Sequence, residues 1–378
     1  MRSVSQETVL LNDFRRLWRA TGQEVLAAVA RVGESGWYIL GEEVRNFEAA
    51  LAATWPAPHV VGVGSGLDAL EIALRCAGVK PGDKVLTTPL SAFATTLAIV
   101  RVGAVPVFAD VDASGLLDLD ACARVLERRR DVRAVLPVHL YGHVLDLDQL
   151  SALAQRFGVA VIEDCAQCIG ARWRGRPAGS VGAVAATSFY PTKNLGALGD
   201  GGAVITGDAA LATQARELRH YGQSATYVHD RLGLNSRLDE LHAAIMARVF
   251  LPRLHEWTAR RREIAAAYRD GIANPQVVLP PVPAGSESVW HLFPVLVAEG
   301  ARGAFMAHMN AAGVQVGVHY PRLIPDQRAL ANYPFVVEGD MARARRFANG
   351  EVSLPIHPFL TNSEVERVIA ACNAWSLP

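Results

Sequence analysis

The 378-residue sequence predicts an α/β fold with a large domain built on a mostly parallel sheet and a smaller α+β domain at the C-terminus. Two observations support this prediction. Short apolar runs alternate with amphipathic segments through the first 250 residues, as is typical of parallel strands joined by covering helices. A proline-rich stretch at residues 275–283 then leads into a shorter part of mixed pattern. We therefore expect a large domain at residues 1–250 and a small domain at residues 251–378.

The elements of the large domain follow from the spacing of apolar residues. A helix is expected at about residues 10–33, with apolar positions at Leu17, Val25 and Val32. A short strand at residues 60–63 then runs into a glycine turn and a helix that starts at Asp68. Further strands are predicted at residues 84–88, 105–109, 134–138, 159–164 and 202–206, and further helices at about residues 92–102, 118–129 and 146–157.

A long helical pattern runs from about residue 238 to residue 270. We expect a bend at Pro252, because proline cannot donate the helical hydrogen bond. The small domain is predicted to contain strands at residues 289–297 and 314–320 and helices near residues 302–312 and 363–375.

Composition indicates a soluble enzyme. The 37 basic and 37 acidic residues give a formal net charge of zero, so no electrostatic field favours nucleic acid or an anionic membrane as a partner. The apolar stretch at residues 92–100 stops at Arg101, far short of a membrane span, and residues 1–14 lack the apolar region of a signal peptide. These features predict a cytoplasmic protein.

The cysteines and histidines give little support to a metal site. Five cysteines are an odd number, which argues against a disulfide framework. Cys165 and Cys168 form a single Cys-x-x-Cys pair, which supplies only half of a structural zinc site. His139 and His143 flank a Tyr-Gly turn without a supporting carboxylate spacing. We expect packing cysteines and no metal.

Lys193 stands in a loop that suits covalent chemistry. It follows an apolar run that ends at Phe189, and Ser188 lies five residues upstream. Four glycines between residues 196 and 202 let the backbone approach a ligand closely. Desolvation lowers the pKa of a lysine ammonium, and the free amine is the form that attacks an aldehyde. A solvent-facing lysine is the more common outcome, so this reading depends on the neighbouring residues.

Two further segments give the lysine a context. Asp164 ends a predicted buried strand, at the edge of an α/β sheet where ligands bind. A carboxylate there suits the protonated ring nitrogen of pyridoxal phosphate, although a helix cap or loop carboxylate is the simpler reading of Asp164 alone. The Gly64–Ser65–Gly66 turn leads into a helix whose free N–H groups could bind a phosphate.

Taken together, these segments resemble the DegT-type (StrS-type) sugar aminotransferases, which are pyridoxal phosphate enzymes of fold type I that act on nucleotide-linked ketosugars. The resemblance covers nearly the whole chain, and its details look closest to enzymes that aminate C3 of dTDP-3-keto-6-deoxyhexoses. It implies a homodimer with shared active sites and an amino-acid donor, with glutamate expected. The motifs that carry it are residues 35–41, 64–70, 137–142, 163–167, 188–196, 233–240 and 318–321.

The resemblance also implies residue roles. Lys193 would form the Schiff base with the cofactor and carry the proton, and Asp164 would pair with the ring nitrogen. Gln167 would bind the ring hydroxyl, and Phe93 would stack on the ring, although an ordinary core position is the default for a phenylalanine. The remaining expected contacts are Gly66, Leu67 and Ser188 to the phosphate, Asn235 to the phosphate of the neighbouring subunit, and His319 and Tyr320 to the sugar.

Two departures from the family pattern leave the substrate open. Leu67 replaces the threonine of many relatives, so one phosphate contact worth roughly 1.5–3 kcal/mol is lost. No histidine follows shortly after the His319-Tyr320-Pro321 motif, as it does in many relatives.

Three alternatives remain. One is a 4-keto-sugar aminotransferase of the same family. An NAD-dependent sugar oxidoreductase would need glycine where Leu67 stands. A non-catalytic cofactor-binding regulator would usually carry a basic DNA-binding module, and none is evident.

Overall fold

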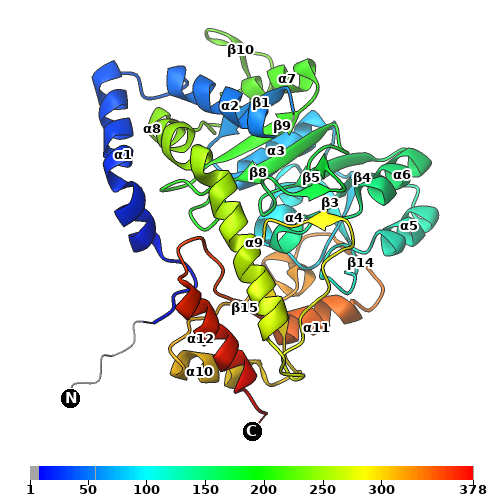
Figure 1. The fold of residues 1–378 in the computed structure, drawn as a ribbon. Coiled ribbons are helices and arrows are strands. Elements are labelled where there is room, and N and C mark those ends of the chain that lie inside the picture. The colour runs from blue at the N-terminus through cyan, green and yellow to red at the C-terminus, as the bar shows by residue number, and fades with distance from the viewer. Residues whose placement is uncertain (1–7, 56, 378) are drawn as a thin grey trace.

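The computed structural model describes residues 8–55 and 57–377 and is centred on an eight-stranded sheet (Figure 1). The strand order is β1-β9-β8-β5-β4-β2-β3-β14, and every neighbouring pair is parallel except the two pairs that β9 makes. This confirms the predicted mostly parallel sheet. The strands are β1 (His59–Val63), β2 (Lys84–Thr87), β3 (Val105–Ala109), β4 (Val132–Leu136), β5 (Ala160–Asp164), β8 (Val184–Ser188), β9 (Gly202–Thr206) and β14 (Val336–Glu338).

Helices connect and cover these strands. The parallel strands all end at the same edge of the sheet, where the loops that follow them can converge on one site. Helix α3 follows β1 and packs against β8 and β9, which brings its N-terminus beside the end of β8. The helices of this part are α1 (Phe14–Ser35), α2 (Glu42–Thr54), α3 (Gly66–Cys76), α4 (Phe93–Arg101), α5 (Leu119–Arg128), α6 (Leu147–Phe157) and α7 (Ala209–Arg219).

The predicted long helix is present and is irregular at the predicted place. It runs through α8 (Glu240–Ile245), a π turn (Met246–Phe250), a 3-10 turn (Leu251–Arg253) and α9 (Leu254–Gly271). Pro252 lies in the 3-10 turn, where its missing N–H interrupts the regular helical hydrogen bonds. This helix leads from the sheet to the C-terminal part of the chain (Figure 1).

A second cluster of buried apolar side chains lies in the C-terminal part, together with Val9. Strand β13 (Phe293–Leu296) pairs with β15 (Glu351–Leu354) in antiparallel orientation, and α9, α10 (Arg302–Ala311) and α12 (Asn362–Asn373) contribute to the cluster. Helix α11 (Ala342–Gly350) precedes β15. Strand β14 returns to the large sheet beside β3, so the chain crosses between the two parts more than once, and the domain boundary at residue 250 stays a prediction.

One strand prediction for this part was too long, and another was wrong. The predicted strand 289–297 is shorter, because its first residues form the loop before β13. Residues 314–320 make only two single bridges, Val314 to Val9 and Gly317 to Ser353. Their alternating pattern reflects one buried side rather than a paired strand. The partner of β13 is β15, which was not predicted because its polar–apolar alternation spans only four residues.

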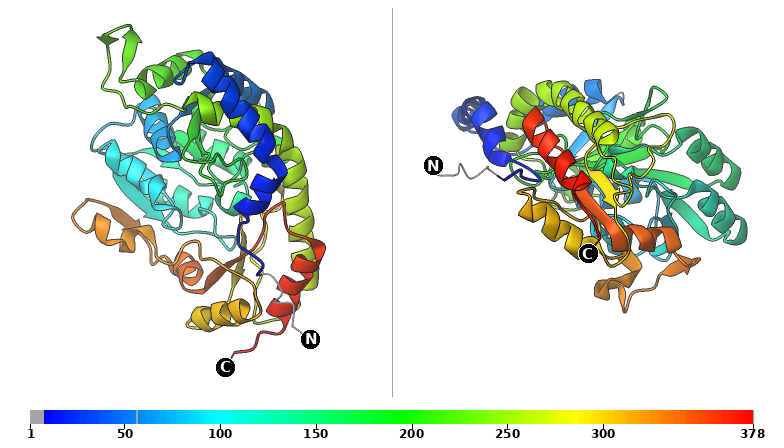
Figure 2. Two further views of the ribbon diagram at one scale, coloured as in Figure 1. Left: turned by 90° about the vertical axis from the view of Figure 1, so that its left-hand side faces the viewer. Right: turned by 60° about the horizontal axis from the view of Figure 1, so that its bottom comes forward.

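The remaining elements are short. A hairpin of β10 (Gln223–Ala225) and β11 (Val228–His229) stands out from the body of the molecule (Figure 2). Within the described residues, no helix combines the length and apolar character needed to cross a membrane. The other elements are β6 (Arg172–Trp173), β7 (Arg176–Pro177), β12 (Ser286–Glu287) and the 3-10 turns Leu140–Gly142, Ile324–Asp326 and Arg328–Leu330.

Candidate active site

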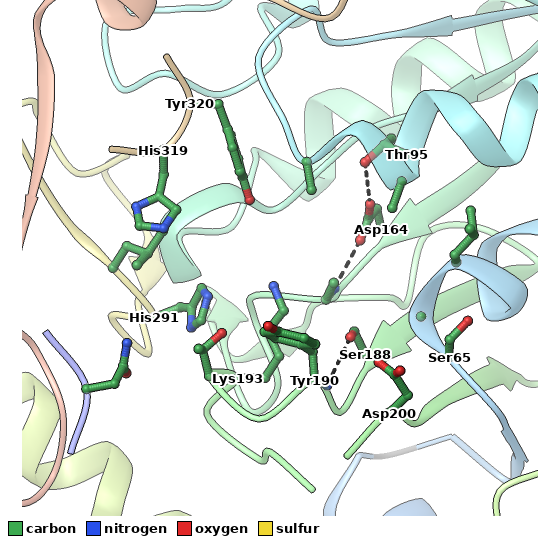
Figure 3. Close-up of a pocket in the computed structure, with 18 of the residues that line it drawn as sticks. Ser65, Thr95, Asp164, Ser188, Tyr190, Lys193, Asp200, His291, His319 and Tyr320 are labelled. Carbon is green, nitrogen blue, oxygen red and sulfur yellow. Dashed lines mark hydrogen bonds between the residues drawn. The ribbon is translucent and has the colours of Figure 1, made fainter. Parts of the chain in front are cut away.

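A cavity of about 490 Å³ opens where β5 and β8 end and α3 begins (Figure 3). Seven of the ten predicted site residues line it, and they come from segments spread over more than 250 residues of sequence. These seven are Gly66, Leu67, Asp164, Ser188, Lys193, His319 and Tyr320.

Lys193 lies in the tight turn after β8. The turn is closed by hydrogen bonds from Lys193 N to Tyr190 O (2.8 Å) and from Ala197 N to Phe189 O (2.7 Å). Gly196 is required, because a Cβ there would overlap the carbonyl oxygen of Pro191. Burial lowers the pKa of Lys193 to about 8, while the Asp164 carboxylate opposes this effect. About a tenth of Lys193 is therefore the neutral amine at pH 7, far more than for a lysine with its ordinary pKa of 10.5.

Asp164 is the last residue of β5 and is buried. Its Oδ1 accepts a hydrogen bond from Ala166 N (3.1 Å), and its Oδ2 accepts one from the hydroxyl of Thr95 (2.9 Å). Burial raises the pKa of Asp164, whereas these hydrogen bonds and the nearby Lys193 lower it. The carboxylate is thus held in one orientation at the cavity wall, and each oxygen keeps a further lone pair for a ligand.

The N-terminus of α3 forms the third side of the cavity. Ser65 caps the helix by accepting a hydrogen bond from Asp68 N (3.1 Å), and within the described residues the N–H groups of Gly66 and Leu67 have no protein acceptor. A Cβ on Gly66 would lie 2.5 Å from Ser188 Cβ, so glycine is needed for the helix to approach β8. This cradle of helix amides and a serine hydroxyl is suited to a phosphate group.

His319 and Tyr320 lie on the opposite side of the cavity (Figure 3). Gln167 is buried behind Tyr320 and donates from Nε2 to the Tyr320 hydroxyl (3.2 Å), while its Oε1 accepts from Tyr141 N (2.7 Å). Gln167 therefore holds Tyr320 in the described structure. Its expected contact with the ring hydroxyl of a cofactor stays a prediction.

Two other predicted residues are not cavity-lining. Phe93 begins α4 and packs against the larger apolar cluster, whereas its neighbours Ala92 and Ala94 line the cavity. Stacking by Phe93 stays a prediction. Asn235 is exposed and lies outside the cavity, and its expected contact with a neighbouring subunit stays a prediction. It is not a helix cap, because Asp239 caps α8.

Seven polar residues of the cavity were not among the predicted site residues. They are Asn12, Ser65, Thr95, Tyr190, Thr192, Asp200 and His291. Ser65, Tyr190 and Thr192 lie within motifs that were recognised, and Thr95 lies two residues after Phe93, so their neighbours offered a signal. His291 lies in a segment that was predicted as strand, and nothing in its spacing distinguished it from a packed histidine.

The Cys-x-x-Cys pair follows Asp164 at the end of β5 and does not line the cavity. Cys165 and Cys168 are free and buried, and burial raises the pKa of both thiols. Cys165 also lies near His139 and Glu163, but that carboxylate already accepts hydrogen bonds from His139 and from three backbone N–H groups. The lone pairs of Glu163 are therefore used in hydrogen bonds that connect the loop at residues 179–182 with His139.

Together, these features fit pyridoxal phosphate. The cradle at Gly66 and Ser188, the desolvated amine of Lys193 and the fixed carboxylate of Asp164 match the phosphate, aldehyde and ring nitrogen of that molecule. The described cavity also lacks an arginine or a second lysine.

Comparison with known proteins agrees with this reading. The DegT/DnrJ/EryC1/StrS aminotransferase family model matches residues 19–373. The chain is 43% identical over 366 residues to a dTDP-3-amino-3,4,6-trideoxy-alpha-D-glucose transaminase from Streptomyces venezuelae, covering 96% of this chain and 95% of that protein. It is 40% identical over 365 residues to a dTDP-3-amino-3,6-dideoxy-alpha-D-galactopyranose transaminase from Aneurinibacillus thermoaerophilus, with coverages of 96% and 98%.

Two solved structures have the same fold. The structure of S. venezuelae DesV in complex with a ketimine intermediate matches with a TM-score of 0.93 at 43% identity, covering 98% of this chain and 99% of that one. The structure of NtdA from Bacillus subtilis with bound cofactor PMP matches with a TM-score of 0.89 at 27% identity, covering 98% and 86%.

Proposed function

The chain belongs to the DegT/DnrJ/EryC1/StrS aminotransferase family and is a sugar aminotransferase, and we propose that it uses pyridoxal phosphate to aminate C3 of a dTDP-linked 3-keto-6-deoxyhexose. The observation that carries the proposal is the meeting of Lys193, Asp164 and the N-terminus of α3 around one cavity. The sugar assignment is supported by the relatives that act on dTDP-linked 3-amino sugars.

Pyridoxal phosphate, when bound, supplies the carbon that carries the amino group and the ring that stabilises negative charge on the reacting carbon. Gly66, Leu67 and Ser188 would hold its phosphate through N–H and O–H donors. The Asp164 carboxylate, fixed by Thr95, would bind the ring N–H and keep the ring positively charged.

Lys193 moves the proton in both halves of the reaction. With a pKa of about 8, its Nζ can accept the proton that leaves the α-carbon of the amino donor, for which we propose L-glutamate. In the second half, Nζ delivers a proton to the sugar carbon that receives the amine. His319 and Tyr320 border the space where the sugar would lie.

We propose that the protein acts as a homodimer with shared sites. Among the described residues, Lys193 is the only lysine or arginine that lines the cavity. The proposed ligands, however, carry a phosphate, a diphosphate and carboxylates. The side chains of Tyr227 and Leu232, in and beside the β10–β11 hairpin, are each 90% exposed, which favours their burial against another copy. Five buried free cysteines support a reducing compartment, and we propose the cytoplasm.

The proposal can be tested with purified holoenzyme and a panel of ketosugar nucleotides. The panel contains 3-keto and 4-keto sugars on dTDP and UDP, with L-glutamate as donor, and the amino sugar is identified by mass spectrometry and NMR. We expect dTDP-3-keto-6-deoxyhexoses to give the highest kcat/KM. A higher kcat/KM with 4-keto sugars would overturn the C3 assignment.

A further inference from the structure

His291 lies in the cavity wall and is held from two directions. Its ring Nδ1 is 3.1 Å from Asn194 Oδ1, and Asn194 is the residue next to Lys193. Its backbone carbonyl accepts a hydrogen bond from the buried guanidinium of Arg261, which also binds the carbonyl of Trp290. The His291 ring is therefore positioned relative to the turn that carries Lys193.

The partners of Asn194 decide which ring nitrogen of His291 carries the hydrogen. Asn194 Nδ2 donates to the carbonyl of Val289 (2.9 Å), so Asn194 Oδ1 faces His291. An amide oxygen only accepts hydrogen bonds, so His291 Nδ1 must donate. A neutral ring with its hydrogen on Nδ1 has a bare lone pair on Nε2.

The surroundings of His291 keep its ring neutral. Burial is the main cause that lowers the pKa of His291 well below its ordinary value, and the positive charges of Lys193 and Arg261 and the nearby His319 add to the effect. No hydrogen bond is formed by His291 Nε2 within the described part of the chain. Because His291 lines the cavity, Nε2 is the polar atom that it leaves for a ligand.

We propose that His291 is a further substrate-contacting residue, whose Nε2 accepts a hydrogen bond from an O–H or N–H of the substrate beside Lys193, and that Asn194 is the positioning residue that fixes this tautomer. The inference rests on the proposed aminotransferase function. Since a bare lone pair repels carboxylate and phosphate oxygens, His291 recognises a hydroxyl or amine group. The source is the sugar ring or the ammonium group of the amino donor.

Two substitutions distinguish the proposed ligand contact of His291 Nε2 from the hydrogen bond between His291 Nδ1 and Asn194. In His291→Asn, the shorter amide can keep a donor near Nδ1 for Asn194 but does not reach the position of Nε2. In His291→Gln, the longer amide can place an acceptor near Nε2 but loses the tie to Asn194. His143→Asn is the matched control, because His143 is also buried and bonded through Nδ1, to Ser288, but does not line the cavity.

Calorimetry on the holoenzymes measures the dissociation constants of dTDP and of dTDP-3-amino-3,6-dideoxy-α-D-galactopyranose. A neutral hydrogen bond is worth about 0.5–1.5 kcal/mol, so we expect His291→Asn to weaken binding of the amino sugar nucleotide roughly 2- to 12-fold and to leave dTDP unchanged. His291→Gln should weaken it less, and His143→Asn should match the wild type. Unchanged amino sugar affinity with a raised KM for glutamate would identify the amino donor as the source.

The proposal is overturned if His291→Asn changes neither the affinity for the amino sugar nucleotide nor the KM for glutamate. If the proposed sugar substrate is wrong, the wild type will bind dTDP but not the amino sugar nucleotide. In that case the effect of His291→Asn on the KM for glutamate tests the role of His291. Long-range ¹H–¹⁵N spectra provide a readout besides activity. The ring signals of His291 are identified as those that are absent from the spectrum of His291→Asn. In the wild type they should show a protonated Nδ1 and an unprotonated Nε2, and a protonated Nε2 would contradict the assignment.

Discussion

The phenol oxygen of Tyr141 donates a 2.8 Å hydrogen bond to the backbone carbonyl of His319. Tyr141 follows β4 of the large sheet, whereas His319 lies 178 residues further along the chain. The backbone N–H of Tyr141 also binds Gln167, which in turn holds Tyr320. One buried tyrosine thus connects the end of β5 with the His319–Tyr320 wall and fixes the width of the cavity between them.

Replacing Lys193 with alanine should abolish turnover while the folded protein still binds pyridoxal phosphate through the cradle at Gly66 and Ser188. Removal of Nζ takes away both the nucleophile and the proton carrier. Borohydride reduction followed by peptide mapping should place the cofactor on Lys193 in the wild type and on no residue in the variant. Turnover at the wild-type rate would refute the assignment of Lys193.

Asp164→Asn should lower kcat more than it raises the KM for the sugar. A charge pair at about 4 Å is worth about 4 kcal/mol at an effective dielectric near 20, before desolvation, which limits the loss to about a thousandfold. Since Asp164 opposes the fall in the pKa of Lys193, its loss should also move that pKa below about 8. The pH dependence of cofactor capture by the apo protein should then have a lower midpoint. A rise in KM alone would place Asp164 in substrate binding.

Gly66→Ala should weaken binding of pyridoxal phosphate. The added Cβ would lie 2.5 Å from Ser188 Cβ and would push α3 away from β8, so the phosphate cradle would widen. Equilibrium dialysis against the cofactor measures the change. Gly33→Ala is the control, because a Cβ at that position of α1 meets nothing within 4 Å, and its cofactor affinity should equal that of the wild type.

Glu351→Gln should change how stability depends on pH. Burial raises the pKa of Glu351 to about 8, so between about pH 4.5 and pH 8 the folded state binds a proton that the unfolded state has lost. Stability should therefore fall as pH rises through this window, by at most about 1.4 kcal/mol per pH unit for this group. Urea titrations at several pH values should show a shallower fall for Glu351→Gln. The exposed Glu256→Gln variant should follow the wild type, and equal slopes in all three proteins would contradict a raised pKa.

Mixing two inactive variants tests whether sites are shared. If Asn235 serves the phosphate of the partner, subunits with Lys193→Ala and subunits with a disabling Asn235 substitution should regain activity after exchange, because some heterodimers contain one intact site. Sedimentation measured at the assay concentration is the control. A fully active monomer would show that Asn235 has no such role.

Local sequence predicted most strands of the large sheet, but not β14. The apolar runs before Asp164 and Lys193 are short and bounded by turn residues, so burial fixes them as strands whatever packs around them. The same holds for the glycine turn before α3, because Gly66 leaves no room for a side chain beside Ser188. These three segments contain the proposed site residues Gly66, Asp164 and Lys193, which the sequence analysis singled out and which line one cavity in the structure.

Only the tertiary structure decided which residues face these three segments across the cavity. His291 is assigned to the cavity because Asn194 and Arg261 hold it there, and those contacts span from 30 to 97 residues of sequence. Strand β14 joins β3, and Tyr141 meets His319, through contacts that have no local signature. The physical reason is that periodicity records which face of an element is buried, whereas the identity of the neighbour that buries it depends on how distant elements pack together.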